Sequence, residues 1–319
     1  MMHRPLALAA LLALAAAPMA AQTVRKDAPV PRRRAAPTTK PAAKPAAKPA
    51  VAPADATQPL ADADLAFAKS AAGLGLRDAM LATFADDAVV FSPRATRARP
   101  VIATMPPSTG QTTWAPAWAD VSAAGELGMT TGPIAFHTTA PDSTANGQYV
   151  TIWTRTGTAW KALIHLTIPG PAATQVAYQV HRAAADGRPR GGPGAADAGR
   201  ATLYIADRAL AFGDDYGASL ARVALPDLHL LREGALPAVG IDSARATLAA
   251  RDARLGGRVR WQSEDARVAR SGDLGVTNGV YERRDAADAI IESGNYLRVW
   301  ERQPDGGWRV LLDAATPLR

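Results

Sequence analysis

Apolar residues in the first half of the chain repeat with a helical period after residue 60. They recur every three or four positions, at Leu65, Ala68, Ala72 and Leu76. This spacing predicts a helix that is interrupted at the glycines 73 and 75 and followed by a shorter helix ending near residue 84. Residues 207–223 show a related pattern. A further helix is predicted over 242–251, with Asp242 as its candidate N-cap.

The C-terminal part of each half instead alternates apolar and polar residues, which is typical of β-hairpins. Residues 147–155 lead through a turn to 160–165, and residues 294–302 lead through a turn to 308–313. A register that pairs Trp153 with Trp160, and Trp300 with Trp308, sorts the side chains onto two faces. One face would carry Tyr149, Thr151, Trp153, Trp160 and Ile164, matched by Tyr296, Arg298, Trp300, Trp308 and Leu312. The other would carry Lys161, Leu163 and His165, matched by Arg309, Leu311 and Asp313.

The two hairpin regions are copies of each other. GELGMTTG at 125–132 returns as GDLGVTNG at 272–279, and GQYVTIWTR at 147–155 returns as GNYLRVWER at 294–302. Both pairs are offset by 147 residues, so we expect one fold to occur twice. Helices followed by an antiparallel sheet predict an α+β fold in each copy.

We divide the chain into five segments on composition and on this repeat. They are a signal peptide (1–21), a basic Ala/Pro/Lys-rich disordered linker (22–59), a first domain (60–170), a Gly/Pro-rich linker (171–200) and a second domain (201–319).

The first segment indicates export. Arg4 precedes a short apolar run and a small-residue cleavage site before Gln22, as in secretory signals. No other segment approaches the run of about 18 apolar residues that a transmembrane helix needs, so none is expected. The Ala/Arg-rich composition is typical of bacteria and predicts a periplasmic location. The chain has no cysteine, which excludes disulfides and thiolate chemistry.

The net charge of +7 belongs to the N-terminal tail. Residues 1–59 hold nine basic and two acidic residues, and the remaining chain is balanced. The 22–59 segment either contacts anionic cell-envelope material or acts only as a solubilising spacer. Nucleic acid is not an expected partner, because the tail has no interleaved aromatic residues for base stacking.

The order of these motifs resembles the nuclear transport factor 2-like superfamily, in particular a bacterial family related to SnoaL-like proteins and ketosteroid isomerase. The resemblance covers most of 60–170 and 201–319. It implies two cone-like domains, each with N-terminal helices packed on a curved antiparallel sheet, and a pocket at the open end of each cone. It also implies that two such domains can pair, either within the chain as a pseudo-dimer or as a homodimer. The superfamily includes isomerases, dehydratases and members without chemistry, so it does not fix the function.

Six aromatic or polar strand residues are candidate ligand-binding residues, and the alternative is ordinary sheet packing. They are Tyr149, Thr151, Trp153, Tyr296, Arg298 and Trp300. His165 and Asp313 occupy equivalent positions and are weak catalytic candidates, as is Asp87 of the Asp86-Asp87 pair. No residue pattern indicates a metal site or a cofactor.

The function we favour from sequence is non-catalytic binding of a small apolar or aromatic molecule in a cone pocket. An isomerase, dehydratase or hydrolase using one cone, and an envelope interaction or structural module, are the alternatives. The copies share turn glycines and aromatic anchors but differ at His165 and Asp313, and at Thr151 and Arg298. At most one cone is therefore expected to be active.

Overall fold

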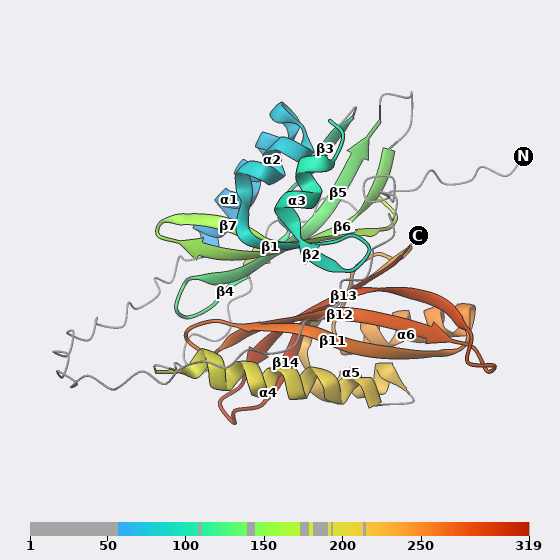
Figure 1. Ribbon diagram of the computed structural model, residues 1–319. Helices are drawn as coiled ribbons and strands as arrows, with labels where there is room; N and C mark the ends of the chain where they lie inside the picture. The colour runs from blue at the N-terminus through green and yellow to red at the C-terminus, as the bar shows by residue number, and fades with distance from the viewer. Residues whose placement is uncertain are drawn as a thin grey trace, which may run out of the picture.

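The protein is built as two sheets packed face to face, with helices on the two outer sides (Figure 1). The structure, a computed structural model, describes residues 57–107, 110–138, 144–172, 179–180, 191–192, 194–212 and 215–318. The predicted signal peptide and nearly all of the predicted basic linker lie outside these residues.

The first half contains three helices and a mixed sheet. The helices are α1 (Thr57–Leu74), α2 (Leu76–Thr83) and α3 (Ala98–Thr104). The strands run in the order β2-β1-β7-β6-β5-β4-β8, and β3 also pairs with β5. Their bounds are β1 Phe84–Phe91, β2 Ala95–Arg97, β3 Gln111–Trp114, β4 Trp118–Val121, β5 Leu127–His137, β6 Thr144–Thr156, β7 Ala159–Pro169 and β8 Gln179–Val180.

The second half repeats this plan with six strands in the order β10-β9-β14-β13-β12-β11. Its helices are α4 (Ala195–Ala209), the short 3₁₀ helix η2 (Leu210–Phe212), α5 (Tyr216–Val223) and α6 (Ile241–Leu255). Its strands are β9 Ala224–Arg232, β10 Ala238–Val239, β11 Arg258–Val268, β12 Leu274–Arg284, β13 Ile290–Arg302 and β14 Trp308–Pro317. Helix α4 begins six residues before the predicted domain start.

The predicted α+β class, with N-terminal helices packed on a curved sheet, is confirmed. Most strand pairs are antiparallel, as expected. In addition β1 runs parallel to β7, and β9 parallel to β14, because each of these strands follows the helices and adds to the sheet beside its last strand. Each sheet is therefore mixed.

The helix predictions are accurate in position and less so in capping. The break between α1 and α2 falls at Gly75, whose φ of +84° suits glycine. The N-cap of α6 is Gly240, which has no side chain to cap with, so the prediction for Asp242 is wrong. Asp242 lies instead in the first turn, where a carboxylate still favours the helix dipole. Among the described helices, none is both long and apolar enough to cross a membrane.

The hydrophobic core has three parts. We call α1–α3 with the inner face of their sheet cone A, and α4–α6 with the inner face of the other sheet cone B. One cluster fills each of these interiors. A third cluster joins the outward faces of the sheets and includes Met129, Ile152 and Leu166 from one and Val276, Val299 and Leu311 from the other. Burying both outer faces against each other explains why the strands of each sheet are apolar on both sides.

Candidate functional site

The inner face of each cone is set by a β-bulge that the sequence does not reveal. Trp153 pairs with Ala162 and not with Trp160, and Trp300 pairs with Val310 and not with Trp308, so both predicted registers are wrong. The pairing then shifts by one residue beside each tryptophan. A bulge adds one residue to one strand, and so it exchanges the faces of all residues beyond it.

This exchange moves His165 and Asp313 to the aromatic face, against our prediction. His165 lies opposite Thr151, and Asp313 opposite Arg298. Ile164 and Leu312, predicted on the aromatic face, belong instead to the cluster between the sheets. Both cones therefore collect more polar groups inside than the alternation predicts.

Cone A contains a buried carboxylate that the sequence analysis missed. Asp64, on α1, is 0 % exposed. Trp114 donates its Nε1–H to Oδ1 of Asp64 at 3.0 Å, and the Tyr149 hydroxyl donates to Oδ2. Burial raises the pKa of Asp64 to about 6, even though hydrogen bonds from Tyr149, Trp114 and Thr130 favour the ionised form.

The hydroxyl of Thr130 connects this carboxylate to the sheet. Trp153 donates its indole N–H to Oγ1 of Thr130 at 2.8 Å, so the hydroxyl proton is available for Asp64. Tyr149, Thr151 and Trp153 are each 0 % exposed. These three predicted binding residues therefore lie in the cone interior, as part of a packed hydrogen-bond network.

His165 is less completely buried than the polar residues next to it, since Asp64, Thr130 and Thr151 are 0 % exposed. Its Nδ1 lies 2.8 Å from the hydroxyl of Thr151, and its ring centroid lies 6.0 to 6.5 Å from those of four aromatic residues. The residue as a whole is half-buried. Burial lowers its pKa to about 4, so the ring is neutral at pH 7. The four rings are Phe67, Phe84, Trp114 and Tyr149.

Cone B repeats the carboxylate network. The Tyr296 hydroxyl donates to Asp207 at 2.5 Å, and the Thr277 hydroxyl donates to the same carboxylate at 3.0 Å. Trp300 in turn donates its indole N–H to Thr277 at 2.9 Å. Asp207 is therefore the counterpart of Asp64 in the second half, at an offset of 143 residues. The fixed offset of 147 would have found Thr130 with Thr277, and Trp114 with Trp261.

Cone B differs from cone A in holding a network of buried ion pairs, in which Arg298 also lies 3.5 Å from Asp313. Arg298 bonds Asp207 at 2.6 Å, and Arg232 bonds Asp313 at 2.8 Å. The Tyr216 hydroxyl also donates to Asp313. Burial opposes the ionisation of Asp313, but the charges of Arg232 and Arg298 outweigh it and hold the pKa of that carboxyl below its usual value. Two arginine side chains and two carboxylates are thus paired in the interior of cone B, and each of them is 4 % exposed or less.

Asp87 is the predicted site residue that lies in neither cone. Its side chain is 49 % exposed and bonds Arg267 of the other half at 2.6 Å. This ion pair links the two halves at the surface, so the structure gives Asp87 no place in a pocket.

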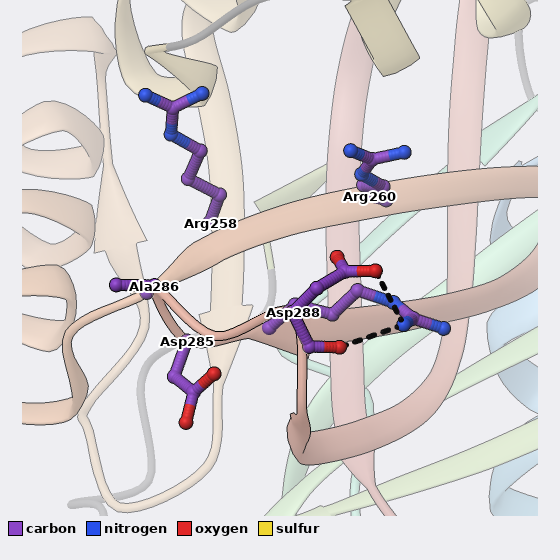
Figure 2. A pocket seen from close by; sticks show the side chains of 7 residues that line it. Arg258, Arg260, Asp285, Ala286 and Asp288 are labelled. Carbon is purple, nitrogen blue, oxygen red and sulfur yellow. Dashed lines mark hydrogen bonds and ion pairs between the residues drawn. The ribbon is translucent and has the colours of Figure 1, made fainter.

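A separate pocket of about 570 Å³ opens beside the start of β11 and the end of β12. Figure 2 shows Arg258 and Arg260 rising from β11, with Asp285 pointing the opposite way. Arg284, which also lines the pocket, is held by Glu282 and Asp288. In the described residues, no group of three or more His, Asp or Glu side chains could hold a metal ion.

Comparisons with known proteins give structural neighbours only. No family model and no curated protein matches the chain. A ketosteroid isomerase-like protein from Erwinia carotovora atroseptica is 16% identical, with 37% of this chain and 95% of that chain covered and a TM-score of 0.33. A protein of the nuclear transport factor 2-like family from Streptomyces avermitilis is 16% identical, with coverages of 39% and 98% and a TM-score of 0.32.

A third neighbour, from Catenulispora acidiphila, was solved in complex with S-DNPA. It is 14% identical, with coverages of 37% and 90% and a TM-score of 0.31. Similarity at this level says nothing about the activity of the present chain.

Proposed function

We propose that the protein is a small-molecule binding protein whose ligand enters cone A. One observation carries the proposal: His165 on the inner face of cone A is only half-buried, whereas the equivalent Asp313 of cone B is 0 % exposed. A partly exposed polar group among aromatic rings is the usual lining of a ligand site.

Cone B acts in this proposal as a structural copy. Its position equivalent to Thr151 carries Arg298, which is 0 % exposed and paired with Asp207. Opening this interior would separate buried charges, which costs several kcal/mol. A ligand that had to displace the ion pairs would therefore bind poorly.

Binding is favoured over catalysis by the state of the two titratable groups in cone A. Both carboxylate oxygens of Asp64 already accept hydrogen bonds, from Trp114 and from Tyr149. His165 has a pKa of about 4, which makes it a weak base at neutral pH. Neither group is therefore placed as an efficient proton acceptor.

The test is a ligand screen read out at His165. The full chain is titrated with a library of small apolar, aromatic, anionic and cationic compounds while the histidine ring signals are followed by NMR. We expect hits that shift the His165 signals and leave His229 unchanged, because His229 stacks on Trp118 between the halves at 3.9 Å. A screen without hits, or hits that never perturb His165, would refute binding in cone A.

Export and envelope contact are a separate proposal, supported only by residues 1–59. Cell fractionation of the full chain would place it in the periplasm, and deletion of 22–59 would reduce association with envelope material if the basic segment is adhesive. Unchanged association would show that the segment is only a spacer.

A further inference from the structure

We propose that the ligand of cone A is a small organic cation, a guanidinium or a primary ammonium, held against Asp64, and that the Arg298 side chain fills the same position in cone B. This inference rests on the proposed function, because it requires that cone A binds a ligand.

Cone B displays how such a cation is held. The Arg298 guanidinium bonds Asp207 at 2.6 Å, and its Cζ lies 4.1 Å from the ring centre of Tyr296 and 4.6 Å from that of Trp261. Tyr216 adds a third ring at 5.5 Å. A carboxylate combined with aromatic faces is the arrangement that recognises organic cations in proteins.

Cone A contains the carboxylate and two of the aromatic rings of this arrangement. Tyr149 and Trp114 lie exactly 147 residues before Tyr296 and Trp261. They flank Asp64 through hydrogen bonds, and their ring centroids are 6.2 Å apart, against 5.3 Å for the pair in cone B. The walls of the cation position are therefore shared by the two cones.

The cation itself is what cone A lacks. Thr151 stands at the position of Arg298, and its hydroxyl is hydrogen-bonded to His165. Within the described part of the chain, Asp64 has hydrogen-bond donors that are all neutral, and no Arg or Lys forms an ion pair with it. An isolated buried carboxylate is costly, so a cation that reaches it gains more than it would at the protein surface.

Two further positions differ between the cones. Leu210 and Tyr216 of cone B correspond to Phe67 and Leu76, since Asp64 precedes Asp207 by 143 residues and α2 begins 140 residues before α5. The ring centroid of Phe67 lies 6.1 Å from that of His165. The ligand we expect is a small headgroup such as guanidinium or methylammonium, which carries the charge that the Arg298 side chain supplies in cone B.

The charges on the other elements around Asp64 do not oppose this assignment. The inward groups are Trp114 on β3, Thr130 on β5, Tyr149 on β6 and His165 on β7, and the imidazole is neutral at pH 7. The apolar ligand that the sequence suggests would leave the Asp64 charge uncompensated, and a cation would neutralise it.

The experiment titrates the full chain at pH 7 with millimolar methylguanidinium, methylammonium and, as matched controls, sodium and neutral acetamide. We expect the two organic cations to shift the His165 ring signals and the controls to leave them unchanged. Asp64→Asn should weaken cation binding about tenfold or more, which corresponds to loss of one favourable charge contact. Equal binding of methylguanidinium by Asp64→Asn would overturn the proposal.

Two exchanges between the cones complete the test. Thr151→Arg supplies a tethered guanidinium, so it should fold and lose methylguanidinium binding. Arg298→Thr opens the same position in cone B, so methylguanidinium should raise its melting temperature more than that of the parent chain. No such rescue, with Arg298→Thr shown to be folded by circular dichroism, would show that the two positions are not equivalent.

The outcomes separate this inference from the proposed function. Neutral compounds that shift His165 while cations do not would leave binding in cone A standing and overturn the cationic ligand. No shift with any compound would overturn both.

Discussion

The carboxylate of Glu126 accepts a hydrogen bond from the backbone N–H of Arg270, which belongs to the other half of the chain. The same contact is made in the opposite direction, because Asp273 accepts the backbone N–H of Ala123 at 2.8 Å. Both residues of the second pair are offset by 147 from those of the first. The two halves therefore meet as the subunits of a two-fold dimer do, with the same patch used on both sides. The acidic residue of the repeated G-[ED]-L-G turn holds the halves together, a role that its sequence alone does not reveal.

Asp273 should be the more important of these two acidic residues for stability. It is 0 % exposed, and besides the Ala123 N–H it accepts the hydroxyl proton of Ser271. Asp273→Ala leaves buried donors without an acceptor, so we expect a loss of about 2–3 kcal/mol in the free energy of unfolding. Urea unfolding measures this change.

Asp86→Asn serves as the control for Asp273→Ala, because the Asp86 side chain is 97 % exposed and forms an ion pair with the exposed Arg99. It should unfold as the parent chain does. Equal midpoints for all three proteins would show that the turn contact contributes nothing to the pairing of the halves.

The buried ion pairs of cone B should respond to mutation far more strongly than the surface pair between the halves. Arg232→Met leaves the Asp313 carboxylate buried with less compensation, and we expect a cost of about 3–5 kcal/mol. Arg267→Met removes the partner of the half-exposed Asp87 and should cost no more than about 1 kcal/mol. Both substitutions exchange the same side chains, so chemical unfolding compares burial directly. A similar cost for the two would contradict the closed interior proposed for cone B.

Asp64 and His165 should impose opposite pH dependences on stability. The pKa of Asp64 rises from 3.8 to about 6 on folding, so the folded chain binds the extra proton and stability falls as pH increases through this window. The pKa of His165 falls from 6.5 to about 4, so the unfolded chain binds the extra proton and stability rises with pH. Each shift corresponds to about 3 kcal/mol. The two contributions largely cancel between about pH 4 and 6.

Two variants isolate the pH dependence that each group contributes. The quantity compared is the free energy of unfolding of the variant minus that of the parent chain. Asp64→Asn should gain stability relative to the parent as the pH is raised from 4 to 6, and His165→Gln should lose it. Unfolding curves across this range provide the measurement, with Asp86→Asn as the exposed control. Parallel pH profiles for Asp64→Asn and the parent chain would show that the Asp64 carboxyl is not perturbed.

The sequence predicts the architecture well because the repeat records it directly. Helical spacing, hairpin turns and the 147-residue offset locate the helices and the sheet of each half. The interiors are harder to predict, since one extra residue in β7 and in β14 reverses the faces beyond it without disturbing the apparent alternation. His165 and Asp313 were assigned to the wrong face for this reason.

Asp64 was missed for a related reason. Loops of different length make the offset 143 in the first helix and 147 in the sheet, so the offset of the sheet does not lead from Asp207 to Asp64. Only the shared tyrosine contact, from Tyr149 to Asp64 and from Tyr296 to Asp207, identifies the true pair. Contacts between a helix and a distant strand carry no local signal in sequence.

Loss of the tyrosine hydroxyl should cost more in cone A than in cone B. Tyr149→Phe removes a donor from Asp64, which has only neutral partners, and we expect a loss of about 1.5–3 kcal/mol at pH 7. Tyr296→Phe leaves Asp207 with Arg298 and Thr277, so its loss should be about 1 kcal/mol. Removing a donor to the ionised form also raises the pKa of Asp64 further.

The difference between the two tyrosine variants should therefore depend on pH. Once Asp64 is protonated in both the parent chain and Tyr149→Phe, near pH 4, the missing donor no longer stabilises a charge and the extra cost of Tyr149→Phe should shrink toward that of Tyr296→Phe. Equilibrium unfolding of both variants at pH 7 and near pH 4 measures this convergence. A constant difference between them would mean that the Asp64 charge is compensated in cone A by a group other than its neutral donors, and the case for a cationic ligand would weaken with it.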